Sequence, residues 1–283
     1  SATCGDTITA YIANNSDVTV QLWRIGAYRQ GSGRLVRSWK VEPENRLTDN
    51  LPIGTIPAHE VKSTVDHRPA YTSASAKDWI PSFSFKVEPD WVPGTYMLIV
   101  NDVHNNLGAT GTPLIVRDDI GIHKTTMLLP TLTWQAYNNW GGADLYSYAQ
   151  NNGSGVDAQA CQEELSESTC ASEAYGDQVT FNRPYSTLTE PNAPFQSIIM
   201  SNIMAANGNL DPNWIAGQDL EQLTPVLMAT KNLVVVFHDE YWTQKMRNSV
   251  TSLTNANTNF TVLSGNTMYH RSTFTDSSLT TFQ

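Results

Sequence analysis

One apolar run that leads directly into charged side chains limits most strongly how this chain can fold. Residues 234–237 are Val-Val-Val-Phe, and His238, Asp239 and Glu240 follow at once. An apolar run without alternation predicts a strand that is buried on both faces, as in a parallel sheet. Open α/β sheets bind their ligands beyond the carboxyl ends of the strands. His238 and Glu240 are therefore predicted to lie where such a fold carries its chemistry.

Strands and helices alternate around this run. Residues 126–129 form a short apolar run, and residues 195–203 carry apolar side chains at helical spacing. A further helix is predicted from about Thr243, and a further strand over residues 260–263. This alternation predicts an α/β domain over residues 119–283, with a mostly parallel, flavodoxin- or amidotransferase-like sheet.

The first part of the chain has a different pattern. Apolar and polar side chains alternate in residues 18–23 and 83–87, which is the period of half-buried antiparallel strands, and residues 96–100 form a stronger apolar strand. Short strands separated by Gly and Pro turns predict an immunoglobulin-like β-sandwich over residues 1–118. Residues 40–80 contain Pro and are predicted to be a long irregular connection.

Composition limits the partners of the chain. Its 283 residues carry a formal net charge of −10, which argues against nucleic acid and anionic membranes as partners because both attract basic surfaces. No stretch approaches the roughly 20 apolar residues of a membrane span. Only 16% of the residues are charged, and Ser, Thr and Asn supply most of the polarity. This composition, with a first residue Ser1 in place of Met, predicts a processed, secreted protein.

The cysteines fit an extracellular chain. Residues 151–178 are rich in Gly, Ser and Glu and are predicted to be an exposed insertion. Cys161 and Cys170 lie within it, and we expect a small disulfide loop, with free thiols as the alternative. Cys4 is left over, either unpaired or bonded to another chain.

Three segments that follow predicted strands collect polar and aromatic side chains. They are Trp134–Gly142, His238–Trp242 and Ser264–Asn266, and the loop Phe181–Tyr185 lies between the first two in the sequence. If the strands are parallel, the three segments project from one edge of the sheet. That edge is predicted to gather Tyr, His, Asp, Glu and Asn side chains.

In order and rough spacing, these segments resemble the large subunit of N,N-dimethylformamidase and its wider family. The motifs are Ala-Tyr-Asn-Asn-Trp-Gly-Gly at 136–142, Asn-Arg-Pro-Tyr at 182–185, His-Asp-Glu-Tyr-Trp at 238–242 with Met246-Arg247, and Ser-Gly-Asn at 264–266 with Tyr269. The resemblance runs over about residues 125–270. The N-terminal part is more loosely similar, through residues 23–26 and 91–96.

The resemblance implies a mononuclear-iron amidohydrolase that cleaves the carbon–nitrogen bond of a small amide. By position, Tyr137, Tyr185 and Glu240 would be the metal ligands, and phenolate and carboxylate oxygens suit a hard ferric ion. His238 would carry a proton to the leaving amine. Asn266 would donate a hydrogen bond to the amide oxygen.

Each of these residues also has a structural interpretation. The two tyrosines would pack in an aromatic-rich core, and Glu240 would form an ion pair with Arg183 or Arg247. His238 would be a hydrogen-bonded structural histidine, and Asn266 would be a turn residue that tolerates positive φ. Asp239 and the two aromatic residues after Glu240 are expected to support the loop and the core.

Two functions therefore stay open. One is the metal-dependent amide hydrolase. The other is a secreted structural or binding protein, a homo-oligomer or a subunit of an extracellular assembly, that keeps the fold with an inactive site. Phe237, where the family often has Gly, and the short chain after Asn266 favour the second. An amidotransferase with a cysteine nucleophile is disfavoured, because no Cys lies at a strand-to-helix turn.

Overall fold

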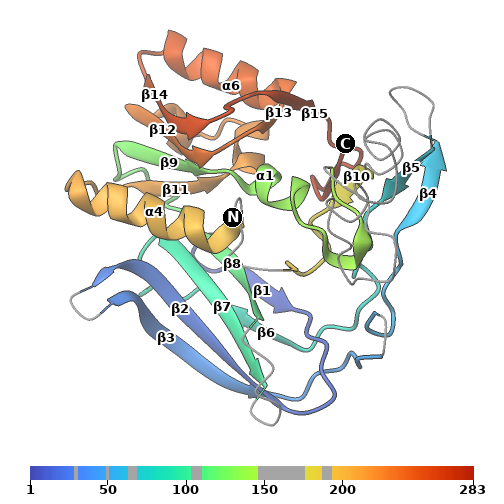
Figure 1. Ribbon diagram of the computed structural model, residues 1–283. Helices are drawn as coiled ribbons and strands as arrows, with labels where there is room; N and C mark the ends of the chain where they lie inside the picture. Colours follow the sequence, from blue (N-terminus) through green and yellow to red (C-terminus); the bar gives the residue numbers. More distant parts are fainter. Residues whose placement is uncertain (29–30, 49–50, 63–68, 103–109, 146–175, 187–192) are drawn as a thin grey trace.

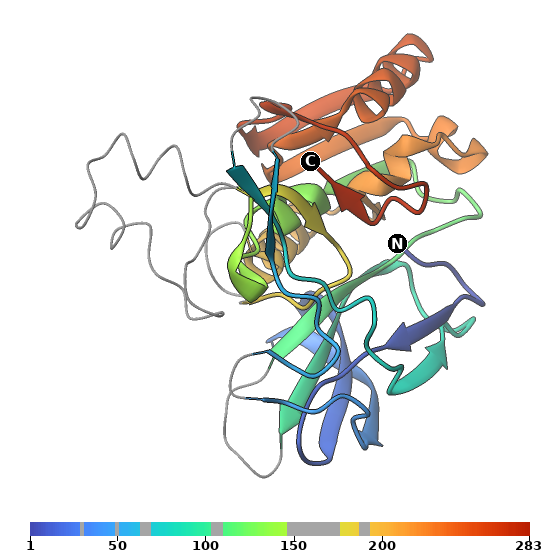
Figure 2. The same cartoon turned by 90° about the vertical axis from the view of Figure 1, so that its right-hand side faces the viewer.

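The computed structural model describes residues 1–28, 31–48, 51–62, 69–102, 110–145, 176–186 and 193–283. Antiparallel and parallel sheets combine with helices in a mixed α/β architecture (Figures 1 and 2). The helices of the described part are α1 (Thr131–Ala136), η1 (Trp140–Gly142), α4 (Pro194–Asn207), η2 (Gly217–Glu221), α5 (Pro225–Met228) and α6 (Gln244–Asn255).

An antiparallel sheet with the strand order β3-β2-β7-β8 forms most of the N-terminal part. Its strands are β2 (Val18–Tyr28), β3 (Gly31–Val41), β7 (Gly94–Asp102) and β8 (Thr110–Val116). The antiparallel pair of β1 (Thr7–Ala10) and β6 (Phe83–Lys86) packs on one face, where Val20, Phe85 and Leu98 share a buried cluster. The three strands expected from alternation and from the apolar run are confirmed.

A parallel sheet with the order β11-β9-β12-β14 forms the second part. Its strands are β9 (Thr125–Leu129), β11 (Asn213–Ala216), β12 (Asn232–His238) and β14 (Asn259–Gly265). Residues 233–236 of β12 are all buried, because helices cover one face of the sheet and α4 covers the other. The expected central strand is therefore confirmed.

Helix α4 lies between the two sheets (Figure 1). Ile198 on this helix is completely buried in a cluster that contains Met97 from the antiparallel sheet and Val236 from the parallel sheet. Helix α6 covers the other face of the parallel sheet, and its buried side chains are Met246, Ser249, Val250 and Leu253. Both helices were predicted from their apolar spacing.

A small third sheet departs from the prediction for residues 40–80. Its order is β16-β10-β5-β4, and its strands are β4 (His59–Lys62), β5 (Pro69–Thr72), β10 (Gly176–Thr180) and β16 (Thr281–Phe282). Figure 2 shows β4 and β5 beside the second part of the chain. The expectation of a wholly irregular connection was wrong, because these short strands are ordered by a partner, β10, that lies about a hundred positions further along the chain.

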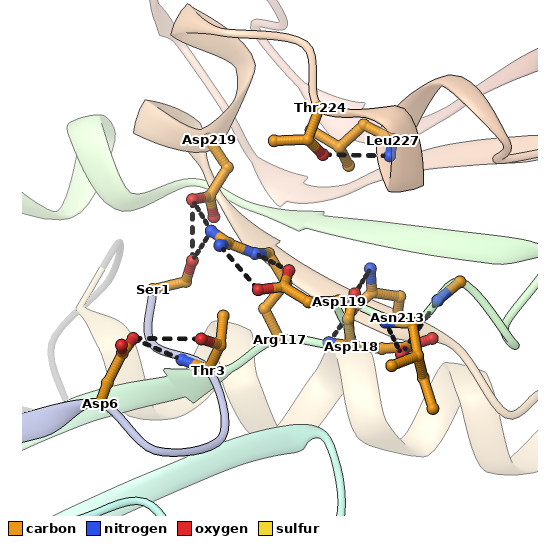
Figure 3. Close-up of polar contacts among 12 residues, drawn as sticks. Ser1, Thr3, Asp6, Arg117, Asp118, Asp119, Asn213, Asp219, Thr224 and Leu227 are labelled. Carbon is orange, nitrogen blue, oxygen red and sulfur yellow. Dashed lines mark hydrogen bonds and ion pairs between the residues drawn. The ribbon is translucent and has the colours of Figure 1, made fainter.

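Residues 117–119 connect the two parts through polar contacts (Figure 3). The Arg117 guanidinium lies 2.6 Å from the carboxylate of Asp219 and 2.8 Å from that of Asp119. Asp118 is buried, and its backbone N–H donates to the side-chain oxygen of Asn213 at 2.8 Å. The Asp118 carboxylate in turn lies 2.6 Å from Nδ1 of His123.

Some expectations concern residues outside the described part. These are most of the insertion 151–178 and the disulfide between Cys161 and Cys170. Cys4 is exposed and free. Among the described helices, none is long and apolar enough to cross a membrane.

Candidate active site

Glu240 lies just beyond the carboxyl end of β12. Phe237 has a φ of +69°, a left-handed conformation that ends the regular course of the strand. The chain then runs through Asp239 and Glu240 into the short strand β13 (Tyr241–Thr243). The backbone N–H of Glu240 donates to the Thr133 hydroxyl at 2.9 Å, and the side chain is only 1% exposed. A buried carboxylate at this edge needs polar partners.

Tyr137 supplies one of those partners. It caps the C-terminus of α1, the helix that follows β9, and it is half-buried. Its hydroxyl donates to Oε2 of Glu240 at 2.8 Å. The ring also meets His238 edge to face, with the ring centroids 6.0 Å apart. The segments after two neighbouring parallel strands thus bring a phenol and a carboxylate together, as the sequence predicts.

His238 lies beside the same carboxylate. Its Nδ1 is 3.9 Å from Oε2 of Glu240, and this buried nitrogen has no hydrogen-bond partner among the described residues. The side chain as a whole is 22% exposed. The imidazole is therefore placed between the buried carboxylate and solvent, and its buried Nδ1 lies on the side of Glu240.

His270 is a residue of this cluster that the sequence did not reveal. Its Nε2 lies 3.5 Å from Oε1 of Glu240, and its ring stacks on Tyr241 with the centroids 4.9 Å apart. Strand β15 (His270–Ser272) pairs with β13, and the backbone N–H of His270 donates to the carbonyl of Glu240 at 2.9 Å. Only its position directly after Tyr269, part of the resemblance, could have drawn attention to it.

Asp239 is buried next to this cluster, with 2% exposure. Burial raises its pKa well above the ordinary value, more than the hydrogen bonding with Trp242 lowers it. Its Oδ2 has no hydrogen-bond partner among the described residues. Its backbone supports the loop, because its N–H donates to the Ser264 hydroxyl at 2.9 Å and its carbonyl accepts from the Trp242 indole at 2.9 Å.

Tyr185 has different surroundings from Tyr137. It is buried in the hydrophobic cluster that includes Ile198 and Trp214, whereas Tyr137 packs against the cluster on the other face of the sheet. Burial raises the pKa of Tyr185 above its ordinary value, and a hydrogen bond with Gln135 opposes that rise. Its predicted place as a metal ligand remains a prediction.

Arg183 holds the loop before Tyr185. Its guanidinium donates to the carbonyl oxygens of Trp140, Ala143 and Gln135 at 3.2, 2.8 and 2.9 Å. Burial lowers the pKa of Arg183 to about 10. These contacts give Arg183 a structural role, and an ion pair of Glu240 with Arg183 or Arg247 remains a prediction.

Asn266 follows β14 in an exposed turn. Its φ is +48°, and its carbonyl accepts from the backbone N–H of Tyr269 at 3.0 Å. Asn is one of the few residues that tolerate this conformation. The turn function expected as an alternative is thus present, and a catalytic function of the side chain remains a prediction.

Two of the three predicted ligand side chains, those of Tyr137 and Glu240, are close enough to bind one hard cation. The Tyr137 hydroxyl and a Glu240 oxygen are 2.8 Å apart, so both can turn toward one ion in place of the proton they share. In the part of the chain that the structure describes, no three or more His, Cys, Asp or Glu side chains are arranged to hold a metal. The predicted ligands are two phenols and one carboxylate, a set that lies outside those residue types.

The fold and the cluster define an α/β protein with a phenol, a carboxylate and two imidazoles at the carboxyl edge of a parallel sheet. The model of the family described as N,N-dimethylformamidase beta subunit-like, C-terminal, matches residues 19–281. The chain therefore belongs to this family, as the motifs in its sequence indicated. A search of curated proteins found no match.

Proposed function

We propose that the chain is a metal-dependent hydrolase that cleaves the carbon–nitrogen bond of a small amide. Tyr137 and Glu240 would hold an iron ion with Tyr185 as the third ligand. The observation that carries the proposal is the hydrogen bond between Tyr137 and the buried Glu240, made beyond the carboxyl ends of two neighbouring strands. Membership of the family supports the same reaction class.

In the proposed reaction, the metal ion and the residues around it would each have a separate role. A bound ferric ion would polarise the amide carbonyl and acidify a coordinated water. The imidazole of His238, whose Nδ1 lies 3.9 Å from Glu240 and whose side chain is 22% exposed, would take up a proton and deliver it to the leaving amine. The side-chain amide of Asn266 would donate a hydrogen bond to the substrate oxygen.

The test is a metal analysis of the purified chain with its visible spectrum. We expect about one iron per chain and a tyrosinate-to-iron charge-transfer band, because a phenolate ligand to a ferric ion absorbs in the visible range. Tyr137→Phe and Tyr185→Phe should each weaken or remove the band, whereas Tyr269→Phe, a change at an exposed ring, should leave it intact. A colourless protein that takes up no iron would reject the proposal.

A second candidate is a secreted structural or binding protein that keeps the fold with an inactive site. The burial of Tyr185 in an apolar cluster and the turn conformation of Asn266 favour it. It predicts a metal-free protein that self-associates, which sedimentation measurements would detect. We further propose that the chain is exported from the cell. We also propose that its N-terminal part is an immunoglobulin-like sandwich and that its parallel sheet is of the flavodoxin or amidotransferase type.

A further inference from the structure

The two edge strands of the parallel sheet differ in how far they are exposed to solvent. Strand β11 at one edge is buried at all four positions, and β7 and β8 of the antiparallel sheet lie against it. Strand β14 at the other edge pairs only with β12 among the described strands and is exposed at most positions. An uncovered edge presents a row of free backbone N–H and C=O groups to any strand that approaches it.

Nothing in β14 blocks such pairing. The strand pairs with β12 over seven residues in continuous register, without a bulge. It contains no Pro and no charged residue, the features with which proteins protect an edge. Val262 and Leu263 are 44% and 51% exposed, and because they are neighbours in a strand they lie on opposite faces. The edge is therefore long, regular and apolar on both sides.

The sequence around β14 is basic in an acidic protein. Residues 241–275 contain Lys245, Arg247 and Arg271 but no Asp or Glu, although the whole chain has a net charge of −10. Lys245 lies 3.9 Å from the carboxylate of Glu221. Arg247 and Arg271 are exposed, and neither forms an ion pair within the described residues. The segments that flank β14 in the sequence thus carry net positive charge, which attracts negative charge.

One face of the edge lies on the same side as α6. Val262 pairs in register with Val235, whose side chain belongs to the buried cluster that contains Met246 of α6. On α6, Arg247 follows that buried residue directly and is exposed. Acidic side chains on the α6 side of an added strand would therefore meet a cation. Leu263 points to the other side, where an added strand would place apolar side chains.

We propose that β14 is a docking edge that binds an extended, acidic peptide segment of a partner protein by strand addition. Backbone hydrogen bonds along the edge would supply affinity, and the cations of α6 and β15 would select acidic segments. A second copy of the chain is a poorer occupant. Pairing of two β14 strands would bring the basic surroundings of both copies together, and like charges repel.

A direct test uses the full chain and two synthetic peptides. One alternates Glu and Val, which places all acidic side chains on one face of the strand and all apolar ones on the other. The second alternates Lys and Val. We expect fluorescence anisotropy to show binding of the Glu-Val peptide, at least about tenfold tighter than that of the Lys-Val peptide at low salt. A third peptide, Glu-Val with N-methylated backbone amides, should not bind, because it cannot donate to the edge.

Charge reversal in the protein gives a matched control. The double variant Arg247→Glu and Arg271→Glu should lose about tenfold or more in affinity for the Glu-Val peptide and gain affinity for the Lys-Val peptide. Lys86→Glu, an exposed lysine on β6 of the other part, should change neither. None of these positions touches Glu240 in the proposed function, so iron binding should be the same in all three proteins.

Three outcomes would overturn the proposal. One is equal binding of the Glu-Val and Lys-Val peptides, and another is undiminished binding of the N-methylated peptide, which would show simple charge attraction. The third is a dimer in sedimentation that Val262→Lys abolishes, because the edge would then bind a second copy of the chain.

Discussion

Tyr137 and Glu240 are 103 positions apart in the sequence, and the hydroxyl of one donates to a carboxylate oxygen of the other at 2.8 Å. The contact exists because β9 and β12 are parallel neighbours and each chain segment turns just after its strand ends. The fold thus creates a polar pair that neither segment could form alone.

Replacing Glu240 with Gln removes the negative charge of this pair but keeps the size and shape of the side chain. The amide oxygen still accepts from Tyr137, so we expect the free energy of unfolding to change by less than about 2 kcal/mol. If Glu240 holds iron as proposed, the iron content should fall at least about tenfold, because a neutral amide is a weaker ligand for a ferric ion than a carboxylate. Metal analysis and urea unfolding measure the two effects, with the exposed Glu42→Gln as control. Full iron content in Glu240→Gln would contradict the assignment.

His270 is expected to position the Glu240 carboxylate. Its side chain is 46% exposed, so His270→Ala should cost less than about 1 kcal/mol of stability. Under the proposed function, loss of the imidazole beside Oε1 of Glu240 should weaken iron binding about tenfold or more and shift the charge-transfer band. His270→Gln keeps a donor near Oε1 and should restore part of the affinity. Equal iron affinity in the Ala and Gln variants would show that His270 only packs against its neighbours and does not position the Glu240 carboxylate.

Asp239 should make the protein less stable as the pH rises. Its pKa in the folded state is well above the value of 3.8 expected when the chain is unfolded. Between these two values the folded state holds a proton that the unfolded state has lost, so stability falls by up to about 1.4 kcal/mol per pH unit. Asp239→Asn should remove this slope and be more stable near pH 7. Urea unfolding at several pH values checks this, and an unchanged slope would refute it.

Asp118 should have the opposite effect. Burial alone would raise its pKa, but hydrogen bonds from His123 and from the backbone N–H of Ile120 outweigh it and lower the pKa below 3.8. Its contribution is therefore complete above that value and is lost as the pH falls through the folded-state pKa. Asp118→Asn should cost about 1–3 kcal/mol at neutral pH and less in acid. A cost that does not shrink on acidification would show that the charge is not what stabilises the loop.

Phe237 offers a test of backbone strain. Its φ of +69° is costly for any residue with a Cβ and free for Gly. Both Phe237→Ala and Phe237→Gly lose the half-buried ring, but only Gly relieves the strain. We expect the Gly variant to be about 1 kcal/mol more stable than the Ala variant, against the usual preference for Ala in regular structure. Chemical denaturation of both variants measures the difference.

The sequence predicted elements whose pattern is long enough to be distinctive. The buried run of β12 and the apolar faces of α4 and α6 are examples, because each extends over two or more turns or over a whole strand. It also predicted that Tyr137, His238 and Glu240 would meet, because parallel strands end at one edge. All of this follows from local periodicity and one rule of sheet topology.

What the sequence did not predict depends on pairing at long range. Strands β4 and β5 are four residues each, and their place is set by β10, so no local pattern marks them. The contact of His270 with Glu240 depends in the same way on the pairing of β15 with β13. Short strands have almost no signature of their own, and their register is decided by partners elsewhere in the chain.

The position of α4 between two sheets has a consequence for how the protein unfolds. Ile198 on this helix is buried in one cluster with Met97 of the antiparallel sheet and Val236 of the parallel sheet, so the same helix contributes to the interior of both parts. Separating the parts would expose an apolar surface on both, which disfavours any state in which one is melted and the other intact. We therefore expect the two sheets to unfold together as one cooperative unit.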